Sequence, residues 1–429
     1  MRRLLVIVMC VVMIFALAAC NGGGGGGNVE NGGSSGGGDS APDRDHILVG
    51  YAGPLTGPMS IFMNPTPWVE ELMLDHINNT LGGIEIGGRK LPLRIIYADN
   101  ESDPNRAVEA ATRLVTENNV DILIGGWTPV GTNTASSVGE RYGVPTFVFG
   151  APEESWLEGG PYDWSMGMTF NYDDMVIDMI NMWDKLDTNK KVGLVLDTTV
   201  DGTVGREVVT RLLDGTGYEI VDPGSFNIGT NDFTGIVSRL RDADVQIVYA
   251  DMITPDFALF WRQCAQFDYI PRVMTINKGM HYAADAAAME PIGIGLTFSA
   301  LWDKNYPFSS ALLGISATEI ADKWEEEHGE FYPYSIGHDV AMYDILYDVL
   351  SRAGSLDKDA IRQAFLATNI NTVFGNLRFN ESRNMRVPAI GTQWVEGDKF
   401  LLDKVIVASE TFPSVPSYDP IIIPITTQR

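Results

Sequence analysis

The chain has 429 residues, of which 45% are hydrophobic and 20% charged, a composition typical of a globular protein large enough for two domains. Its formal net charge is −26 at pH 7, and it would be −28 without Arg2 and Arg3. This excess of negative charge argues against nucleic acid as a partner and against a body that lies on an anionic lipid surface. It does not define a ligand, because a local cleft need not share the sign of the whole protein.

The first residues have the pattern of a bacterial lipoprotein signal. Two arginines precede an apolar run over 4–17, which is too short and wrongly flanked for a membrane-spanning helix. The sequence Leu-Ala-Ala-Cys at 17–20 resembles a lipobox. We therefore expect residues 1–19 to be a cleaved signal and Cys20 to be lipidated, which would tie the protein to the bilayer. An ordinary secretory signal with an incidental cysteine is the alternative.

Residues 20–42 are mostly glycine, serine and asparagine, and such a segment cannot bury enough apolar surface to fold. As a flexible leash it would reach roughly 25 Å, at about 5–6 Å times the square root of its length. The expected location is the extracytoplasmic face of the bacterial cell membrane. Only Cys264 lies in the body, so no internal disulfide is expected. Its place on an expected helix favours a buried structural thiol over a nucleophile.

From residue 45 onward, short β-branched runs alternate with amphipathic patterns, which is typical of parallel βαβ units. The first array has expected strands at 47–51, 91–97, 122–124 and 146–149, and helices at 67–78 and from 104. Asp103 followed by Pro104 is a typical helix start. The second array has expected strands at 192–196, 247–250 and 273–276, with a helix over about 233–240.

Beyond residue 291 the pattern is less regular. Helices are expected near 316–328, 338–353 and 357–367, and short strands at 377–379 and 392–395. Two successive arrays predict an α/β protein with two doubly wound lobes. In such sheets, ligands bind at the carboxyl ends of the parallel strands.

A series of short motifs runs through the body in a fixed order. They are GYAGPLTG at 50–57, LGGI at 81–84, DNESDP at 99–104, VDILIGG at 120–126, YGVP at 142–145, DFT at 232–234, YPF at 306–308 and GNLRF at 375–379. Each motif is weak alone. Their order over almost the whole body resembles the type I periplasmic solute-binding proteins, in particular the branched-chain amino acid-binding branch that serves ABC importers.

The resemblance implies two lobes joined by three crossovers, with a ligand enclosed between them. Lobe 1 would comprise 45–170 and 300–380, and lobe 2 would comprise 171–299 and 381–429. It also implies a small organic solute, amino acid-like or a carboxylate, an ABC permease as the membrane partner, a monomeric body and no cofactor. A ligand-sensing receptor of the same fold, signalling through a membrane partner, is the alternative.

In lobe 1 the candidate ligand contacts lie in the loops that follow the strands. Backbone N–H groups at a helix start suit a carboxylate, and threonine hydroxyls add donors. Trp127 offers a flat apolar wall, or else covers the edge of the core. The candidates are Leu55, Thr56, Trp127, Thr128, Ala151 and Glu153.

In lobe 2 the candidates are Asp201, Asp251, Lys278 and Tyr282. Amino acid-binding relatives place a carboxylate near Lys278, where it pairs with the ammonium of the ligand. A lysine reverses that charge and would favour an anionic ligand group. Glu153 or Asp251 could still meet an ammonium from another side. The alternative is that Lys278 points to solvent.

The sequence lacks the signatures of common enzymes. It contains no G-x-S-x-G, no H-E-x-x-H and no G-x-x-x-x-G-K-[ST] motif. Its five histidines are scattered without the spacing of metal ligands. We expect neither catalysis nor a metal site, although a hydrolase on an α/β scaffold is a third possibility.

Overall fold

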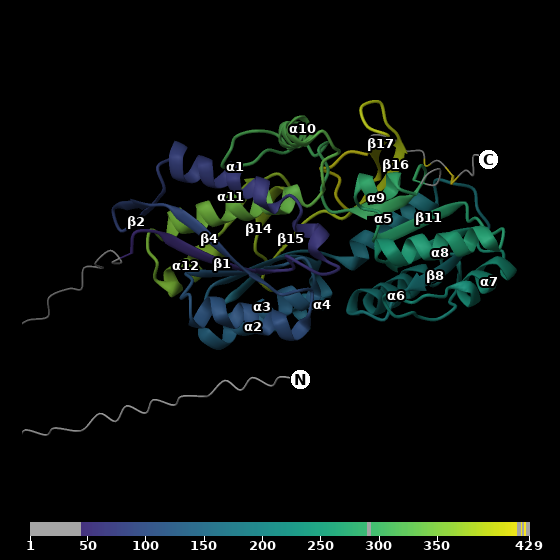
Figure 1. Cartoon of the computed structure of the whole chain (residues 1–429), viewed down its shortest axis with the longest axis horizontal. Coiled ribbons are helices and arrows are strands. Elements are labelled where there is room, and N and C mark those ends of the chain that lie inside the picture. Colours follow the sequence, from purple (N-terminus) through teal and green to yellow (C-terminus); the bar gives the residue numbers. More distant parts are fainter. Residues whose placement is uncertain (1–43, 290–292, 418–421, 423, 426–429) are drawn as a thin grey trace, which may run out of the picture. The chain divides into compact units, whose positions relative to one another are not determined.

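The computed structural model describes residues 44–289, 293–417, 422, 424 and 425. The expected signal, the expected leash and Cys20 lie outside these residues. Within the described part of the chain, no helix is long and apolar enough to cross a membrane. The body contains two α/β lobes, each built on its own large sheet (Figure 1).

The first sheet has six strands in the order β15-β7-β6-β5-β1-β4, and all of its neighbouring strands are parallel. Its central strands read as continuous apolar runs because helices cover both faces of the sheet. Asp103 caps the helix that follows β4, as expected, and its carboxylate accepts from the N–H groups of Asn105 and Arg106. The strands are β1 (Ile47–Gly53), β4 (Leu93–Asp99), β5 (Ile122–Gly126), β6 (Thr146–Pro152), β7 (Ser165–Phe170) and β15 (Asn384–Arg386).

Helices α2 and α3 lie on one side of this sheet, and α1 and α11 lie on the other (Figure 1). The helices of this part are η1 (Ser60–Met63), α1 (Thr66–Asp75), η2 (His76–Thr80), α2 (Pro104–Thr116), α3 (Pro129–Tyr142), α4 (Glu153–Leu157), α10 (Ala317–His328), α11 (Ile336–Ala353) and α12 (Lys358–Leu366). Two small antiparallel hairpins are β2 (Ile84–Ile86) with β3 (Arg89–Leu91), and β13 (Asn369–Thr372) with β14 (Gly375–Arg378).

The second sheet has seven strands in the order β17-β16-β12-β11-β10-β8-β9. Strands β8 to β12 are parallel, and the hairpin β16–β17 adds an antiparallel edge. The strands are β8 (Lys191–Leu196), β9 (Glu219–Val221), β10 (Ile247–Met252), β11 (Val273–Lys278), β12 (Thr297–Ala300), β16 (Ile390–Glu396) and β17 (Leu402–Ala408). The helices are α5 (Tyr172–Trp183), α6 (Val200–Leu213), α7 (Thr234–Asp242), α8 (Thr254–Gln266) and α9 (Ala283–Ala287).

The chain passes between the two sheets after β7, after β12 and between β15 and β16. Strand β15 pairs with β7, with Asn384 opposite Gly167, so the first sheet includes residues beyond 380. This differs from the expected division, which ended lobe 1 at residue 380. A strand of three residues gives no periodic signal in the sequence, so its partner is set by tertiary structure.

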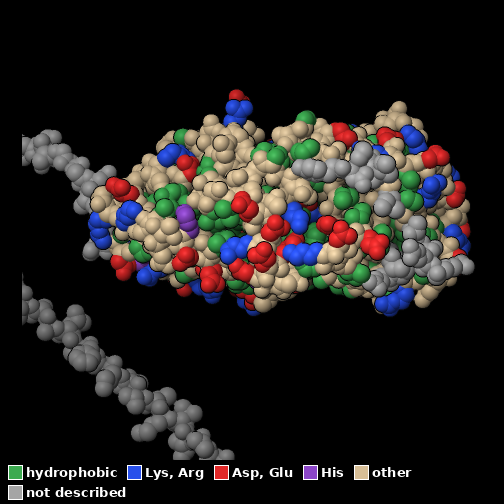
Figure 2. Space-filling view, turned by 90° about the horizontal axis from the view of Figure 1, so that it is seen from above, with side chains coloured by type: hydrophobic (Ala, Val, Ile, Leu, Met, Phe, Trp, Pro, Cys, Tyr) green, Lys and Arg blue, Asp and Glu red, His purple; other side chains and the backbone are tan. Residues whose placement is uncertain are grey.

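Charged side chains of both signs are spread over the surface of the body. Figure 2 shows Lys and Arg side chains among Asp and Glu side chains on one face. This arrangement agrees with a well-solvated acidic surface.

Candidate functional site

A cavity of about 270 Å³ lies at the carboxyl ends of the parallel strands of the two large sheets. Its lining comes from the loops after β4, β5 and β8, from the ends of β6, β10 and β11, and from β12. Both lobes therefore contribute to one cavity. Lobe 1 also supplies Met59 and Phe62 from the segment after β1, and Tyr334 from the segment before α11.

The lobe 1 side of the cavity is an aromatic wall. The ring of Phe62 stacks on that of Trp127, with centroids 5.7 Å apart and planes at 9°. The edges of Phe149 and Tyr334 pack against the same indole. Trp127 is only 4% exposed, and it both lines the cavity and belongs to the core. The Trp127 side chain is therefore part of the cavity wall and part of the core, and its contact with a ligand stays a prediction.

Three side chains that line the cavity lie on strained backbone, those of Trp127, Lys278 and Ser102, and Ser102 has a φ of 55°. Trp127 has a φ of 70° and Lys278 a φ of 65°, in the left-handed region that side chains with a Cβ rarely adopt. Trp127 and Lys278 lie at or just after the end of a parallel strand, one in each lobe. Such conformations persist only where the surroundings enforce them, and they gather at functional sites. The strain is a second reason to place the functional site here.

Gly150, near the end of β6, makes room for Trp127. Its φ is 74°, and a Cβ there would lie 2.9 Å from Cε3 of Trp127. We expect Gly150→Ala to lower the free energy of unfolding by about 1–3 kcal/mol, measured by urea denaturation. Gly88→Ala is the matched control, because Gly88 has a φ of 77° and no neighbour within 4 Å of that position. Equal losses in both variants would show that contact with Trp127 contributes nothing.

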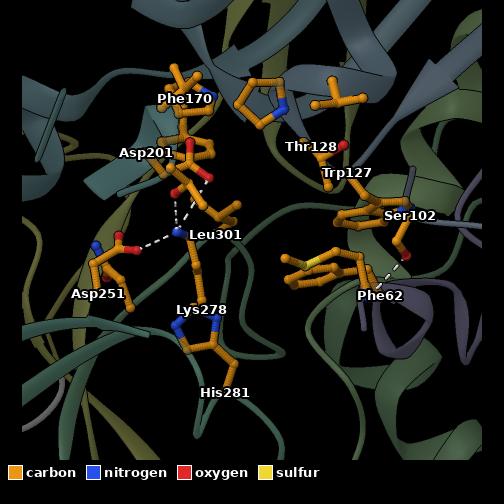
Figure 3. A pocket seen from close by; sticks show the side chains of 18 of the residues that line it. Phe62, Ser102, Trp127, Thr128, Phe170, Asp201, Asp251, Lys278, His281 and Leu301 are labelled. Carbon is orange, nitrogen blue, oxygen red and sulfur yellow. Dashed lines mark hydrogen bonds and ion pairs between the residues drawn. The ribbon is translucent and has the colours of Figure 1, made fainter. Parts of the chain in front are cut away.

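In lobe 2, three aspartates surround the ammonium of Lys278. Figure 3 shows two of them, Asp201 and Asp251. Its Nζ lies 2.8 Å from Asp197 Oδ2, 2.6 Å from Asp251 Oδ1 and 3.8 Å from Asp201 Oδ2. It also donates to Thr199 Oγ1 at 2.8 Å. Only 11% of the Lys278 side chain is exposed. The alternative that Lys278 points to solvent is therefore wrong.

Asp201, Asp251 and Lys278 shift one another's pKa values. Burial lowers the pKa of Lys278, but the carboxylates of Asp251, Asp201 and Asp197 outweigh burial and raise it above its usual value. Burial raises the pKa of Asp201 to about 6, although the lysine opposes the shift. The pKa of Asp251 is also raised by burial and lowered in part by Lys278. At neutral pH Lys278 is charged. The carboxyls of Asp201 and Asp251 ionise at a higher pH than an exposed aspartate, and that of Asp201 ionises near pH 6.

The structure brings five of the ten expected ligand contacts to the cavity. These are Trp127, Thr128, Asp201, Asp251 and Lys278. The other five lie outside its lining: Leu55, Thr56, Ala151, Glu153 and Tyr282.

Each of these five has a local reason for its place. Asp99 accepts the N–H groups of Leu55 and Thr56 and the hydroxyl of Thr56, and so holds the loop after β1 to the end of β4. Ala151 is buried within β6, and Tyr282 packs its ring against Tyr334.

Glu153 lies where the chain passes between the lobes. Its Oε2 accepts from Arg386 Nη2 at 3.0 Å and from Asn171 Nδ2 at 3.3 Å. Nη1 of Arg386 in turn donates to Asp174 Oδ2 at 3.2 Å, at the start of α5. Glu153 therefore contacts the crossover segments instead of the cavity.

Several residues that line the cavity are not among the contacts predicted from the sequence. Phe62 lies in the short helix η1 and Met59 directly precedes it, and Tyr334 comes from a distant part of the chain. No sequence pattern marks these three. Asp197 is not part of the lining, but it contacts Lys278 and is absent from the candidates predicted from the sequence. Its position directly after the expected strand at 192–196 is a signal that could have identified it.

Metal-ligating side chains are not grouped in the described residues. No group of three or more His, Cys, Asp or Glu side chains there is arranged to hold a metal ion. His281 lines the cavity, and burial lowers its pKa to about 4. Cys264 is fully buried, and burial raises the pKa of its thiol, as expected for a structural cysteine.

Comparisons with known proteins agree with this architecture. The family described as periplasmic binding protein matches residues 46–399. Leu/Ile/Val-binding protein homolog 7 from Brucella suis is 24% identical over 377 residues, which cover 83% of this chain and 91% of that protein.

Solved structures share the fold. A leucine-binding protein from Thermotoga maritima has a TM-score of 0.72 at 17% identity, over 85% of this chain and 99% of its own. An ABC transporter solute-binding protein from Rhodopseudomonas palustris, in complex with 3,4-dihydroxybenzoic acid, has a TM-score of 0.68 at 16% identity, over 86% and 99%. The chain belongs to the periplasmic binding protein family, and its relatives include Leu/Ile/Val-binding protein homologues.

Proposed function

We propose that this protein is the solute-binding component of an ABC importer and that it captures a small organic solute between its two lobes. The observation that carries the proposal is the cavity at the carboxyl ends of both sheets, which takes its lining from both lobes. A solute in that cavity would touch Trp127 and Thr128 on one side and Asp201, Asp251 and Lys278 on the other. Binding then favours the closed arrangement of the lobes, because only that arrangement makes both sets of contacts.

The crossovers suit such a movement. Arg386 pairs with Glu153 of lobe 1 and Asp174 of lobe 2. At the crossover after β12, Lys404 Nζ lies 3.2 Å from Asp303 Oδ2, and both side chains are buried. Ion pairs that hold the ends of the crossovers would restrict the φ and ψ changes of closure to a few residues between them.

The expected lipid anchor belongs to the same proposal. Acylation of Cys20 would hold the body at the outer face of the membrane, near a permease. We expect Cys20→Ala to move the protein from the membrane fraction to the soluble extracytoplasmic fraction, as seen by immunoblot. Protein that stays in the membrane fraction would contradict anchoring at Cys20.

The similar proteins do not agree on a solute. One is named for leucine, another for Leu, Ile and Val, and a third carries 3,4-dihydroxybenzoic acid. The solute of this chain must therefore be argued from its own residues.

A solute screen tests the proposed function directly. Amino acids, amines, carboxylates, amides and aromatic acids are added to the purified protein, and thermal unfolding is measured. A solute at about 100 times its dissociation constant should stabilise the protein by roughly 2.7 kcal/mol. Small-angle scattering should show contraction with the same solute. The solute should also be recovered chemically unchanged, since a product would indicate a hydrolase.

Transport is tested in cells. A strain without the gene should lose uptake of the solute that the screen identifies. Unchanged uptake together with a lost response to the solute would favour the receptor alternative.

A further inference from the structure

The charges at the cavity are unbalanced. Among the described residues, the charged side chains in its lining are Asp201, Asp251 and Lys278. Asp197 lies against the same lysine with no exposed surface on its side chain. Three carboxylates thus share one ammonium. His281 is neutral at pH 7, because burial lowers its pKa to about 4.

The ammonium of Lys278 is directed at groups of the protein itself. An ammonium carries three N–H donors. Asp197 and Thr199 each accept one at 2.8 Å, and Asp251 Oδ1 lies 2.6 Å away. Asp197 is itself fully engaged, since its Oδ1 also accepts the N–H and hydroxyl of Thr199. Lys278 is therefore the internal partner of Asp197, and an anionic ligand group would have to compete with Asp197 and Asp251 for its ammonium.

Asp201 and Asp251 keep free acceptors. In the described structure, the buried oxygens Oδ1 of Asp201 and Oδ2 of Asp251 have no hydrogen-bond partner. Both residues line the cavity, and Asp251 is 1% exposed. A buried acceptor without a donor costs free energy, and a donor on a ligand would remove that cost.

An apolar surface lies across the cavity from these carboxylates. Figure 3 shows Trp127 and Phe62 on the side opposite Asp201 and Asp251. Much of the remaining lining is apolar, namely Met59, Val130, Met175, Val200, Ile228 and Leu301. Such a surface accommodates an apolar body, and the face of an indole also attracts cations.

We propose that the solute is an organic cation whose charged nitrogen binds to Asp201 and Asp251 and whose apolar part packs on Trp127 and Phe62. The inference rests on the proposed function and narrows its solute to one chemical class. Lys278 acts as a positioning residue that neutralises Asp197. It is not the group that recognises the solute.

A matched series of three probes tests the class of the solute. Phenethylamine, phenylalanine and 3-phenylpropanoate share one hydrocarbon body and differ in charge. Titration calorimetry at pH 7 should give an affinity for phenethylamine at least tenfold higher than for 3-phenylpropanoate, with phenylalanine between them. Equal or tighter binding of the acid would overturn the inference. So would a lack of amine binding at millimolar concentration.

Asp201→Asn tests the contact itself. Because the Asp201 side chain is 20% exposed and its Oδ1 has no partner among the described side chains, this variant should keep its fold. Its affinity for phenethylamine should fall at least tenfold, while its affinity for 3-phenylpropanoate should not fall. Asp242→Asn makes the same charge change on the exposed end of α7 and should bind like the parent. Equal losses in both variants would indicate a long-range field and overturn the direct contact.

The pH dependence gives an independent readout. Asp201 faces Lys278, Asp251 and Asp197, and the hydroxyl of Tyr172 donates to its backbone carbonyl. Affinity for the amine should fall as the pH drops below about 6, where Asp201 takes up a proton. Affinity that is constant between pH 7 and about 5 would contradict an ionised Asp201 as the contact.

The inference and the proposed function can fail separately. If the solute screen finds a neutral or anionic solute that closes the protein, the inference is overturned and the proposed function stands. If no solute in the screen stabilises the protein and uptake is unchanged in the deletion strain, the proposed function fails.

Discussion

Replacing Lys278 with methionine should lower the free energy of unfolding by about 3–5 kcal/mol at pH 7, the usual effect of removing one partner from a buried ion pair. Asp197 and Asp251 would remain buried, with 0% and 1% of their side chains exposed, and would have no counter-ion. Urea denaturation measures the loss. Lys323→Met is the control, because Lys323 is exposed and pairs with Glu327 on the surface of α10. It should change stability by less than about 0.5 kcal/mol.

The loss in Lys278→Met should shrink in acid. Lys278 lowers the pKa of Asp201 and Asp251 in the folded protein, so its removal raises both pKa values further. A carboxyl whose folded pKa exceeds its unfolded pKa destabilises the protein as the pH rises between the two values. The variant should therefore regain stability as the pH falls from 7 toward about 5. A small loss that is independent of pH would contradict the buried ion pair.

This result would also decide between two interpretations of Lys278. The sequence alone favours a lysine that binds an anionic solute. Such a lysine could be replaced with little effect on the free energy of unfolding. The structure makes it the partner of Asp197, 81 residues away in the chain. A large loss of stability supports the internal ion pair, and unchanged stability with lost affinity for an anion supports the sequence interpretation.

The sequence predicts the α/β fold because hydrophobic periodicity is a local property. The strands at 122–124, 192–196 and 273–276 are short and mostly apolar runs, and each is found in the structure as the core of β5, β8 or β11. The helix that starts at Asp103 and Pro104 is local for the same reason. Strand β15 is not local, since its place is set by its pairing with β7.

The same reasoning from the sequence predicts only part of the candidate site. The rule that ligands bind at the carboxyl ends of parallel strands places Trp127, Asp251 and Lys278 at the cavity, because each ends or follows such a strand. The rule gives the edge of the sheet but not the direction of a side chain. For that reason it also selects Thr56, whose hydroxyl is bound to Asp99, and Glu153, which is bound to Arg386.

A second large effect is expected in lobe 1, at Asp339 on α11. Its side chain is fully buried, its Oδ2 accepts from Thr66 Oγ1 of α1 at 2.8 Å, and its Oδ1 has no hydrogen-bond partner among the described residues. Burial raises the pKa of Asp339 to about 8, with Thr66 opposing the shift and Glu70 adding to it. At pH 7 the carboxyl is therefore protonated in the folded protein and ionised in the unfolded chain.

The sign of the effect on stability follows from this difference. Between about pH 4, the unfolded pKa, and about pH 8, the folded state binds a proton that the unfolded state does not, so stability falls as the pH rises. At pH 7 the proton uptake costs about 3–5 kcal/mol, from about 1.4 kcal/mol for each pH unit between the unfolded pKa and pH 7. Asparagine has nearly the same shape, keeps an acceptor for Thr66 and needs no proton.

We therefore expect Asp339→Asn to raise the free energy of unfolding by about 2–4 kcal/mol at pH 7, with the gain vanishing near pH 4. Urea denaturation at several pH values measures both quantities, and Asp242→Asn, an exposed site, should show neither. A variant less stable than the parent at every pH would mean that the acidic hydrogen of Asp339 donates a bond that the asparagine amide cannot replace. In that case burial alone would not explain the raised pKa, because a hydrogen bond from the protonated form would also be holding the proton on the carboxyl.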